Sequence, residues 1–281
     1  MAFNCHFCDH CDGYGCVGEM PGMGGPNASR NFILNCEAWA KIPAGPYLLP
    51  SPELRLAPIT GAVENVGYED ERQLYFDLIH HCAGQGIKLS IGDGTPDCKL
   101  QYGIAAVKDA QRTDAAIRAA VFIKPYANEK IFSRLEWADG VAEIAGIDID
   151  AYNIITMRNL VKLEKKSPEQ LMELKRHCNA KGLPFAIKGI FTDADREAVK
   201  QVKPDIVYIS NHGGRVETRE GSTAQFLAEH AAELRSFCGQ LWIDGGIRTA
   251  EDIAKAASYG VHTVLQGRPI ITAVCKEHRS R

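Results

Sequence analysis

The chain has 281 residues, of which 45% are hydrophobic and 24% are charged, with 32 Lys and Arg against 35 Asp and Glu. A net charge of −3 gives no reason to expect a nucleic acid or an acidic membrane as a partner. No apolar run reaches the length of a membrane span, and the opening MAFNCHFCDH lacks the basic and apolar regions of a signal peptide. We expect a cytoplasmic globular protein, with one large α/β domain or two small ones.

Residues 1–52 are rich in Cys, Gly and Pro and show no sustained strand or helix period, which predicts an N-terminal extension. Four of the ten cysteines have the spacing C-x2-C-x2-C-x4-C, at Cys5, Cys8, Cys11 and Cys16. Four thiolates this close can bind one zinc ion or an iron-sulfur cluster. We favour a metal site and leave its identity open between zinc and iron-sulfur. The alternative is a set of reduced thiols in a mobile tail.

From residue 53 to residue 281, short apolar runs alternate with helical patterns. The eight runs are RLAPIT (55–60), IKLSIG (87–92), AAVFIK (119–124), VAEIAGID (141–148), PFAIKG (184–189), DIVYIS (205–210), LWIDGG (241–246) and HTVLQG (262–267). Each run is apolar on both faces, as a parallel strand covered by helices requires. Eight strand-helix units predict a (β/α)8 TIM barrel, because an open doubly wound sheet more often has five to seven strands.

The segments between the runs carry helix start and stop signals. In SPEQLMELKRHCNAKG, Ser167 is placed to cap a helix that begins with Pro168, Gln170 completes a capping box, and Gly182 follows the end. TAEDIAKAASYG repeats the pattern. These signals support the alternation of strands and helices.

Polar side chains follow most of the predicted strands. The set comprises Thr60, Ser90, Asp93, Lys124, Asp148, Asp150, Lys188, Ser210, Asn211, His212, Arg215, Asp244, Arg248 and Arg268. Taken singly, each is explained by a solvated rim or a structural hydrogen bond. Because the active sites of TIM barrels lie at the carboxyl ends of the strands, the whole set predicts one site at the barrel mouth.

The last two units carry a more specific signal, since DGGIR and QGRP each place glycine and arginine after a strand. Many barrels bind phosphate there through loop amides, a helix N-terminus and a guanidinium. The alternative is two tight turns with unrelated arginines. We favour phosphate binding, because glycines permit close backbone approach and both arginines occupy matching places.

The motifs PFAIKG, YISNHGGR, LWIDGGIR and VLQGRPI, in this order and spacing, resemble the FMN-dependent α-hydroxy-acid oxidase/dehydrogenase family, which includes glycolate and lactate oxidases. The resemblance implies FMN as cofactor and oxidation of a small 2-hydroxy acid to the 2-oxo acid. Oxygen or a redox partner is the implied electron acceptor, and a homo-oligomer is implied as well. The segment GEMPGMGG resembles a clostridial-type subgroup with an N-terminal cysteine cluster.

The resemblance also implies roles for individual residues. His212 matches the base, Arg215 and Arg158 match substrate-carboxylate ligands, and Lys188 matches the lysine that stabilises reduced flavin. The implied FMN contacts are Ala57, Pro58, Thr60, Ser90, Lys188, Ser210, Asp244, Gly246, Arg248, Gly267 and Arg268. A guanidinium suits the carboxylate, because it binds two oxygens at once.

The third strand departs from the family pattern. Glutamine and tyrosine are typical there, whereas this chain has Ile123 and Pro125 at the nearest positions, with Lys124 and Tyr126 as replacements. Two other functions therefore stay in competition. One is an FMN barrel of the type 2 isopentenyl-diphosphate isomerase kind, against which HGGR counts. The other is a non-catalytic flavin- or metal-binding protein, against which His212, Arg215 and Lys188 count.

Overall fold

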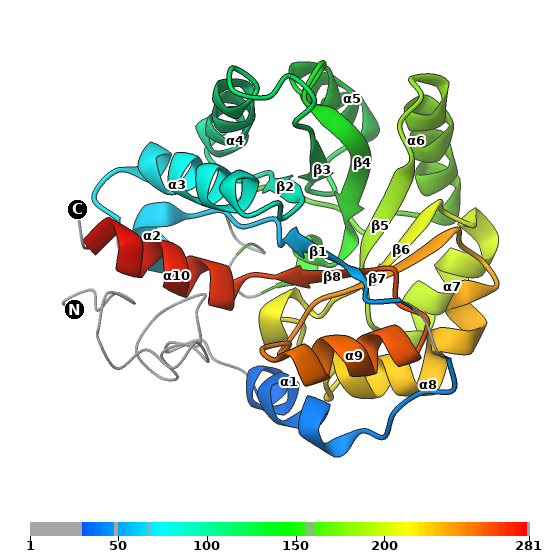
Figure 1. Ribbon diagram of the computed structural model, residues 1–281. Helices are drawn as coiled ribbons and strands as arrows, with labels where there is room; N and C mark the ends of the chain where they lie inside the picture. Colours follow the sequence, from blue (N-terminus) through cyan, green and yellow to red (C-terminus); the bar gives the residue numbers. More distant parts are fainter. Residues whose placement is uncertain (1–29, 48–49, 67, 155–156, 158–159, 280–281) are drawn as a thin grey trace.

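The computed structural model describes residues 30–279, apart from short gaps at 48–49, 67, 155–156 and 158–159. Eight parallel strands form its centre (Figure 1): β1 (Glu53–Leu56), β2 (Leu89–Gly92), β3 (Ala119–Ile123), β4 (Ala142–Asp148), β5 (Phe185–Ile190), β6 (Ile206–Ile209), β7 (Gln240–Ile243) and β8 (Thr263–Gln266). The strands pair in the order β1-β8-β7-β6-β5-β4-β3-β2. A parallel bridge between Arg55 and Lys88 joins β1 to β2 and closes the barrel. The predicted (β/α)8 fold is confirmed, and all eight predicted runs overlap a strand.

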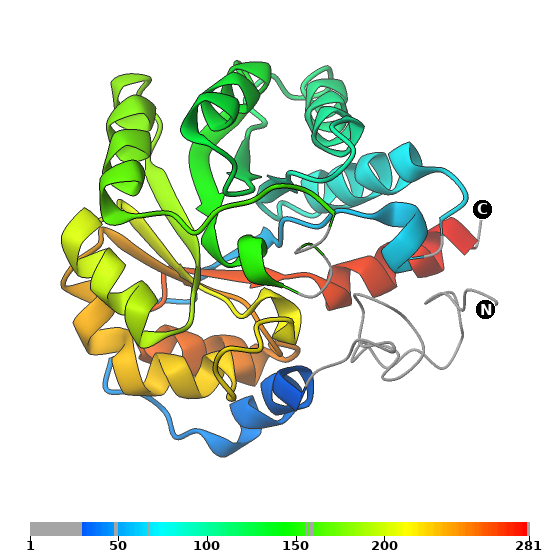
Figure 2. The same cartoon turned by 180° about the vertical axis from the view of Figure 1, so that it is seen from behind.

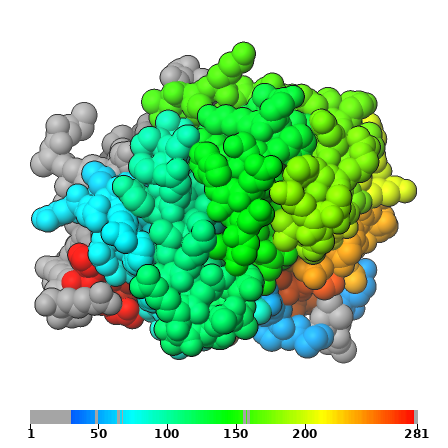
Figure 3. Space-filling view, turned by 90° about the horizontal axis from the view of Figure 1, so that it is seen from above, coloured from blue at the N-terminus to red at the C-terminus, as the bar shows by residue number. Residues whose placement is uncertain are grey.

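Helices surround the barrel on the outside. They are α1 (Arg30–Lys41), α2 (Ala62–Val66), α3 (Glu71–Gly84), α4 (Cys98–Ala110), α5 (Asn128–Trp137), α6 (Pro168–Ala180), α7 (Asp193–Val202), α8 (Thr223–Arg235), α9 (Ala250–Ser258) and α10 (Arg268–Arg279), with 3-10 turns η1 (Ile149–Asn153) and η2 (His212–Gly214). The view from above shows α3 to α6 succeeding one another in chain order on one flank (Figure 3). Among the described residues, no helix combines the length and the apolarity needed to cross a membrane.

The helix signals in the sequence are confirmed at α6 and α9. Ser167 and Gln170 form a reciprocal capping box at the start of α6, and Thr249 and Asp252 form another at α9. The residue after the α6 cap, Gly182, has a φ of +75°, the left-handed geometry that ends many helices. These local signals mark where the two helices begin, whereas most of their stability comes from packing against the barrel.

Helix α1 corrects the expectation that residues 1–52 contain no sustained helix. Its buried residues are Asn31, Phe32, Asn35, Ala38 and Trp39. They recur at helical spacing, but two of them are asparagines, so the apolar period is broken. The buried face of this helix is partly polar, and a search for apolar periodicity does not detect it.

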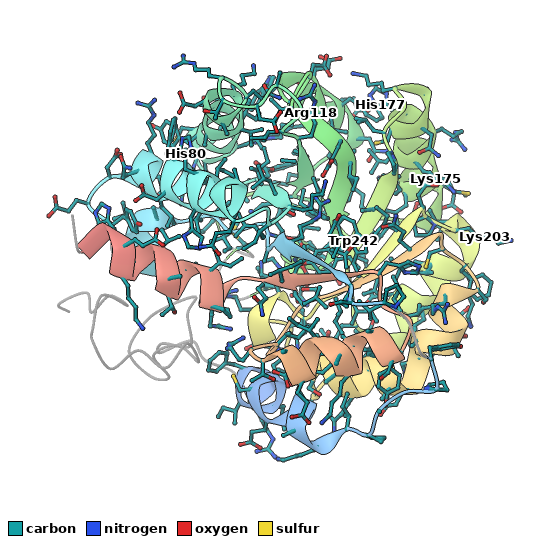
Figure 4. The ribbon with its side chains drawn as sticks, in the orientation of Figure 1. His80, Arg118, Lys175, His177, Lys203 and Trp242 are labelled. Carbon is teal, nitrogen blue, oxygen red and sulfur yellow. The ribbon has the colours of Figure 1, made fainter. Side chains whose placement is uncertain are left out.

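Side chains fill the inside of the barrel. Phe122, Tyr208 and Trp242 pack there with small and aliphatic residues of the other strands, and Trp242 points into the centre of the barrel, whereas His80, Arg118 and His177 lie on the outer helices and loops (Figure 4). At the amino-terminal end, the guanidinium of Arg55 lies 5.0 Å from the Trp242 ring and pairs with Glu53 and Glu143. This ion-paired arginine lies beside a cavity of about 360 Å³ at the amino-terminal end, whereas the active sites of TIM barrels lie at the carboxyl ends of the strands.

A buried ion pair fixes the end of β3. Arg134 of α5 bonds Asp93 after β2 at 2.6 Å, and both side chains are almost fully buried. Asp93 in turn accepts hydrogen bonds from the backbone N–H of Lys124 through its carboxylate and from Lys124 Nζ through its main-chain carbonyl. The pair therefore positions a lysine at the barrel mouth.

Replacing Arg134 with Met is expected to lower the free energy of unfolding by about 3–5 kcal/mol, because the buried Asp93 carboxylate would lose its partner. Urea unfolding followed by circular dichroism measures the loss. Arg112→Met is the matched control, since that arginine pairs with Asp109 on the surface with 82% of its side chain exposed. Equal stability of the two variants would contradict a structural role for the buried pair.

Candidate active site

A cavity of about 380 Å³ opens at the carboxyl ends of the strands. The predicted site residues that line it are Ala57, Pro58, Thr60, Lys188, His212, Arg215, Asp244, Gly246, Arg248, Gly267 and Arg268. Residues from β1, β5, β6, β7 and β8 thus converge on one space. Lys124, which the sequence places at the barrel mouth, lines it as well, and so do Lys99 and Gln266, which were not assigned to a site from sequence.

Some predicted residues do not reach the cavity wall. Ser90 is buried within β2, and Ser210 is buried behind His212, whose backbone N–H donates to its hydroxyl at 3.2 Å. Arg158 and the four cysteines at positions 5, 8, 11 and 16 lie outside the described residues. Of the two replacements considered after β3, Lys124 lines the cavity, and buried Tyr126 stacks against Lys130 and Arg134 instead.

His212 is held by two carboxylates that sequence reasoning placed at the barrel mouth but did not link to it. Its Nδ1 lies 2.8 Å from Asp150 Oδ1 and 3.6 Å from Asp148 Oδ2. Asp148 is the last residue of β4, and Asp150 belongs to η1, which lies in front of the sheet in Figure 2. The signal in the sequence was the pair D-x-D at a strand end, but only the fold brings it to a histidine 62 residues away.

Lys188 of β5 pairs with the first of these carboxylates. Its Nζ lies 2.6 Å from Asp148 Oδ1, and both side chains are largely buried. Burial alone would raise the pKa of Asp148, but Lys188 and His212 hold it well below its ordinary value. Burial would lower the pKa of Lys188, yet Asp148 and Asp150 raise it. The lysine therefore stays charged beside the cavity.

Asp150 titrates differently from Asp148. Burial and the neighbouring charge of Asp148 raise the pKa of Asp150 to about 6. Burial and Lys188 lower the pKa of His212, but Asp148 and Asp150 outweigh them and raise it. Two groups in contact thus both have raised pKa values, and perturbed pairs of this kind are typical of acid-base sites.

The same three groups, Asp148, Asp150 and His212, have ligand atoms within 4.8 Å of one another. Such a set could hold a metal ion in another setting. Here the Lys188 ammonium already bonds Asp148 and would repel a second cation. The cluster is therefore poorly suited to a cation.

Three arginines gather on the other side of the cavity. A methyl group at Gly213 would lie 3.3 Å from Arg215 Nη1 and 3.8 Å from Arg268 Nη2. Burial, followed by the charges of Arg215 and Arg248, lowers the pKa of Arg268 to about 9. Burial also lowers the pKa of Arg215, to about 10. Clustered guanidiniums with depressed pKa values bind anions strongly, because an anion relieves both burial and repulsion.

The geometry around Arg268 fits a phosphate. Arg268 is the first residue of α10, so the positive end of that helix faces the cavity next to Gly267. Its buried Nε has no hydrogen-bond partner among the described residues. Its guanidinium lies 4.1 Å from the Phe32 ring of α1, which fixes its plane. A phosphate-bearing cofactor would satisfy the charge and the donors of this corner.

A family model decides the relationship. The model described as FMN-dependent dehydrogenase matches residues 109–280, which is more than half of the chain. The chain belongs to the FMN-dependent dehydrogenase family. FMN carries a phosphate, and the donors at Arg248, Arg268 and the α10 N-terminus suit it.

Individual relatives agree over shorter stretches. The chain is 34% identical over 95 residues to 2-hydroxyacid oxidase 2 of Rattus norvegicus, covering 34% of this chain and 27% of the relative. It is 39% identical over 89 residues to a 2-hydroxyacid oxidase of Dictyostelium discoideum, covering 32% and 23%. The matches thus span about a quarter of each relative's length.

Among solved structures, a mutant of mandelate oxidase with a monooxide FMN adduct superposes with a TM-score of 0.65 at 19% identity, covering 88% of this chain and 79% of that one. At this identity the likeness shows the barrel fold. It agrees with the strand order described above.

Replacing Arg268 with Gln is expected to weaken FMN binding about tenfold to a hundredfold, because a buried charge-assisted hydrogen bond to phosphate is lost. Fluorescence titration of the apoprotein with FMN measures the dissociation constant. Arg118→Gln, on the outer surface (Figure 4), provides the control and should bind as the wild type does. An unchanged constant in Arg268→Gln would place the phosphate elsewhere.

Proposed function

We propose that the protein oxidises a small 2-hydroxy acid to the 2-oxo acid, with FMN as the electron acceptor. The observation that supports this proposal is the meeting in one cavity of a carboxylate-backed histidine, a charged lysine and three arginines. The names of the relatives, 2-hydroxyacid oxidases, point the same way.

His212 is the proposed base. When Nδ1–H donates to Asp150, the lone pair of Nε2 is available to take the proton from the substrate hydroxyl. The positive charge that the ring then carries is stabilised by Asp150 and Asp148 behind it. The carboxylates thus hold the tautomer and the orientation of the ring.

Arg215 is the proposed ligand of the substrate carboxylate. Its Nη1 donates to the main-chain oxygen of His212 at 2.8 Å, so the guanidinium is tied to the loop that carries the base. Its other N–H groups can bind a carboxylate at a fixed distance from His212. We propose Arg158 as a second ligand; it lies outside the described residues.

Arg248, Arg268 and the loop glycines would hold the phosphate of FMN, and Ala57, Pro58 and Thr60 would line its other side. FMN, when bound, supplies the acceptor for the two electrons that leave the substrate carbon. Lys188 keeps a positive charge in the cavity wall, which favours negative charge developing there.

Further parts of the proposal rest on the sequence. The electrons leave to oxygen or to a redox partner, and Cys5, Cys8, Cys11 and Cys16 bind zinc or an iron-sulfur cluster. A homo-oligomer, the clostridial-type subgroup and the division into residues 1–52 and 53–281 stay predictions. So does the cytoplasmic location, since relatives include a peroxisomal (S)-2-hydroxyacid oxidase of Arabidopsis thaliana.

The test is the visible absorbance spectrum of the protein purified without oxygen, recorded before and after addition of a panel of 2-hydroxy acids. We expect flavin bands that bleach with at least one acid. Flavin bands that no acid bleaches would favour the isomerase-like or non-catalytic alternatives, and an absence of flavin would overturn the phosphate assignment.

Replacing His212 with Ala is expected to slow substrate-dependent flavin reduction by about 10²–10⁴-fold, because the base is removed. FMN should remain bound, since the arginine cluster is intact. Stopped-flow absorbance measures the rate, and His80→Ala on the outer helix α3 is the control (Figure 4). Retained reduction in His212→Ala would contradict the proposed mechanism.

The pH dependence of kcat/KM follows from the raised pKa of His212. Only the neutral ring accepts a proton, so the rate should fall as pH drops below that pKa, with a midpoint above the ordinary 6.5. Asp150→Asn removes a carboxylate that raises this pKa, and the acidic limb should move to lower pH. A limb that stays in place would show that Asp150 does not tune the base.

A further inference from the structure

Helix α1 contacts the loop that carries His212, although the two are far apart in the sequence. Asn35 Nδ2 donates to Asn211 Oδ1 at 2.7 Å, and Asn211 Nδ2 donates back to Asn35 Oδ1 at 3.1 Å. The same Oδ1 accepts from the backbone N–H of Thr223, the first residue of α8, at 3.0 Å. The Asn35 amide therefore joins α8 to the start of the loop that carries His212, residues 211–215, which we call the base loop.

The amide pair is continued into η2. The backbone N–H of Gly214 donates both to Asn211 Oδ1 and to the main-chain oxygen of Asn211, each at 3.0 Å, and these bonds close the turn around His212. His212 itself has a φ of +56°, which is rare for a residue with a side chain. A turn that holds a non-glycine residue in this conformation depends on the contacts around it.

The backbone of α1 presses on both site loops. A methyl group at Gly214 would lie 2.4 Å from the backbone nitrogen of Phe32, and one at Gly246 would lie 1.8 Å from the carbonyl oxygen of Asn35. Both glycines have positive φ values, +91° and +78°. The second glycine of HGGR and the second glycine of DGGIR are therefore required by the approach of α1 as well as by the turns.

Further bonds join α1 to the loop after β7, residues 244–248, which we call the phosphate loop. Trp39 Nε1 donates to the carbonyl oxygen of Gly245 at 2.7 Å, and Thr223 Oγ1 donates to the same oxygen at 3.2 Å. Lys255 Nζ of α9 donates to the carbonyl oxygen of Trp39 at 2.8 Å. The helix thus sits against the base loop and the phosphate loop at once, beside α8 and α9 (Figures 1 and 2).

We propose that Asn35 is a positioning residue that sets the distance between the base loop and the phosphate loop through its amide pair with Asn211. The expected effect on turnover rests on the proposed function, whereas the effect on loop order does not. Asn35 is 2% exposed and Asn211 is fully buried, so water cannot replace the bonds without opening the contact. Only a side chain with both a donor and an acceptor completes the pair.

The matched control lies one turn earlier on the same helix. Asn31 is also buried, at 4% exposed, and bonds the carbonyl oxygens of Val216 and Arg219 and the backbone N–H of Gly221. These partners follow Arg215 and belong to neither His212 nor the phosphate loop. Asn31→Ala therefore removes a comparable set of bonds from α1 and none that Asn211 itself makes to α1; its partners Val216 and Gly221 contact Asn211 through their own backbone groups, which stay in place.

The experiment compares Asn35→Ala and Asn31→Ala in the full chain by three measurements: hydrogen exchange, FMN titration and kcat. In Asn35→Ala, the amides of Gly214 and Thr223 should exchange at least tenfold faster, FMN should bind about tenfold more weakly, and kcat should fall about tenfold. Asn31→Ala should lose similar thermal stability and leave these three quantities within about threefold of the wild type. Equal effects in the two variants would reduce Asn35 to a general structural residue and overturn the proposal.

Asn35→Asp provides a second test should the alanine variant fail to fold. The carboxylate still accepts from Asn211 and Thr223 but cannot donate to Asn211 Oδ1, so exchange at Gly214 should rise while Thr223 stays protected. Unchanged exchange at Gly214 in Asn35→Asp would also overturn the proposal. If the wild type oxidises no 2-hydroxy acid, the proposed function fails, and the exchange measurements still decide the role of Asn35.

Discussion

The ion pair between Lys188 and Asp148 is the interaction on which the proposed chemistry depends. It lies at the end of two adjacent strands, and its two atoms are 2.6 Å apart in a buried setting. Without the lysine, two neighbouring carboxylates could not both stay charged, and one would take up a proton. Lys188 helps to hold the pKa of Asp148 well below its ordinary value, and the charge of Asp148 in turn helps to raise the pKa of Asp150 to about 6. The lysine thus gives the two neighbouring aspartates different pKa values.

The cavity is divided by charge. Acidic groups stand behind His212, and guanidiniums stand on the side of β7 and β8. Burying so many charges costs stability, since each loses hydration. The apolar packing inside the barrel offsets this loss of stability. Ion pairs such as Arg134 with Asp93 hold the strand ends in place.

Much of the fold follows from local sequence rules. The eight apolar runs and the capping boxes predict every strand and two helix starts, because parallel strands and helix caps leave signals within a few residues. The site is less local. Glycine and arginine after β7 and β8 indicate a phosphate corner, but the link from Asp150 to His212 spans 62 residues and exists only in the folded barrel.

Helix α1 shows why the remainder escaped prediction. Its buried asparagines weaken the apolar pattern that would reveal a helix, and their partner Asn211 lies 176 residues away from Asn35. The family model that matches residues 109–280 does not reach it either. Yet Gly214 and Gly246, one in each site loop, have room for no side chain because the backbone of this helix lies against them. The sequence assigns Gly246 to the phosphate site, but the residue is also a glycine because α1 packs against it. Only the structure shows this second reason for a glycine at that position.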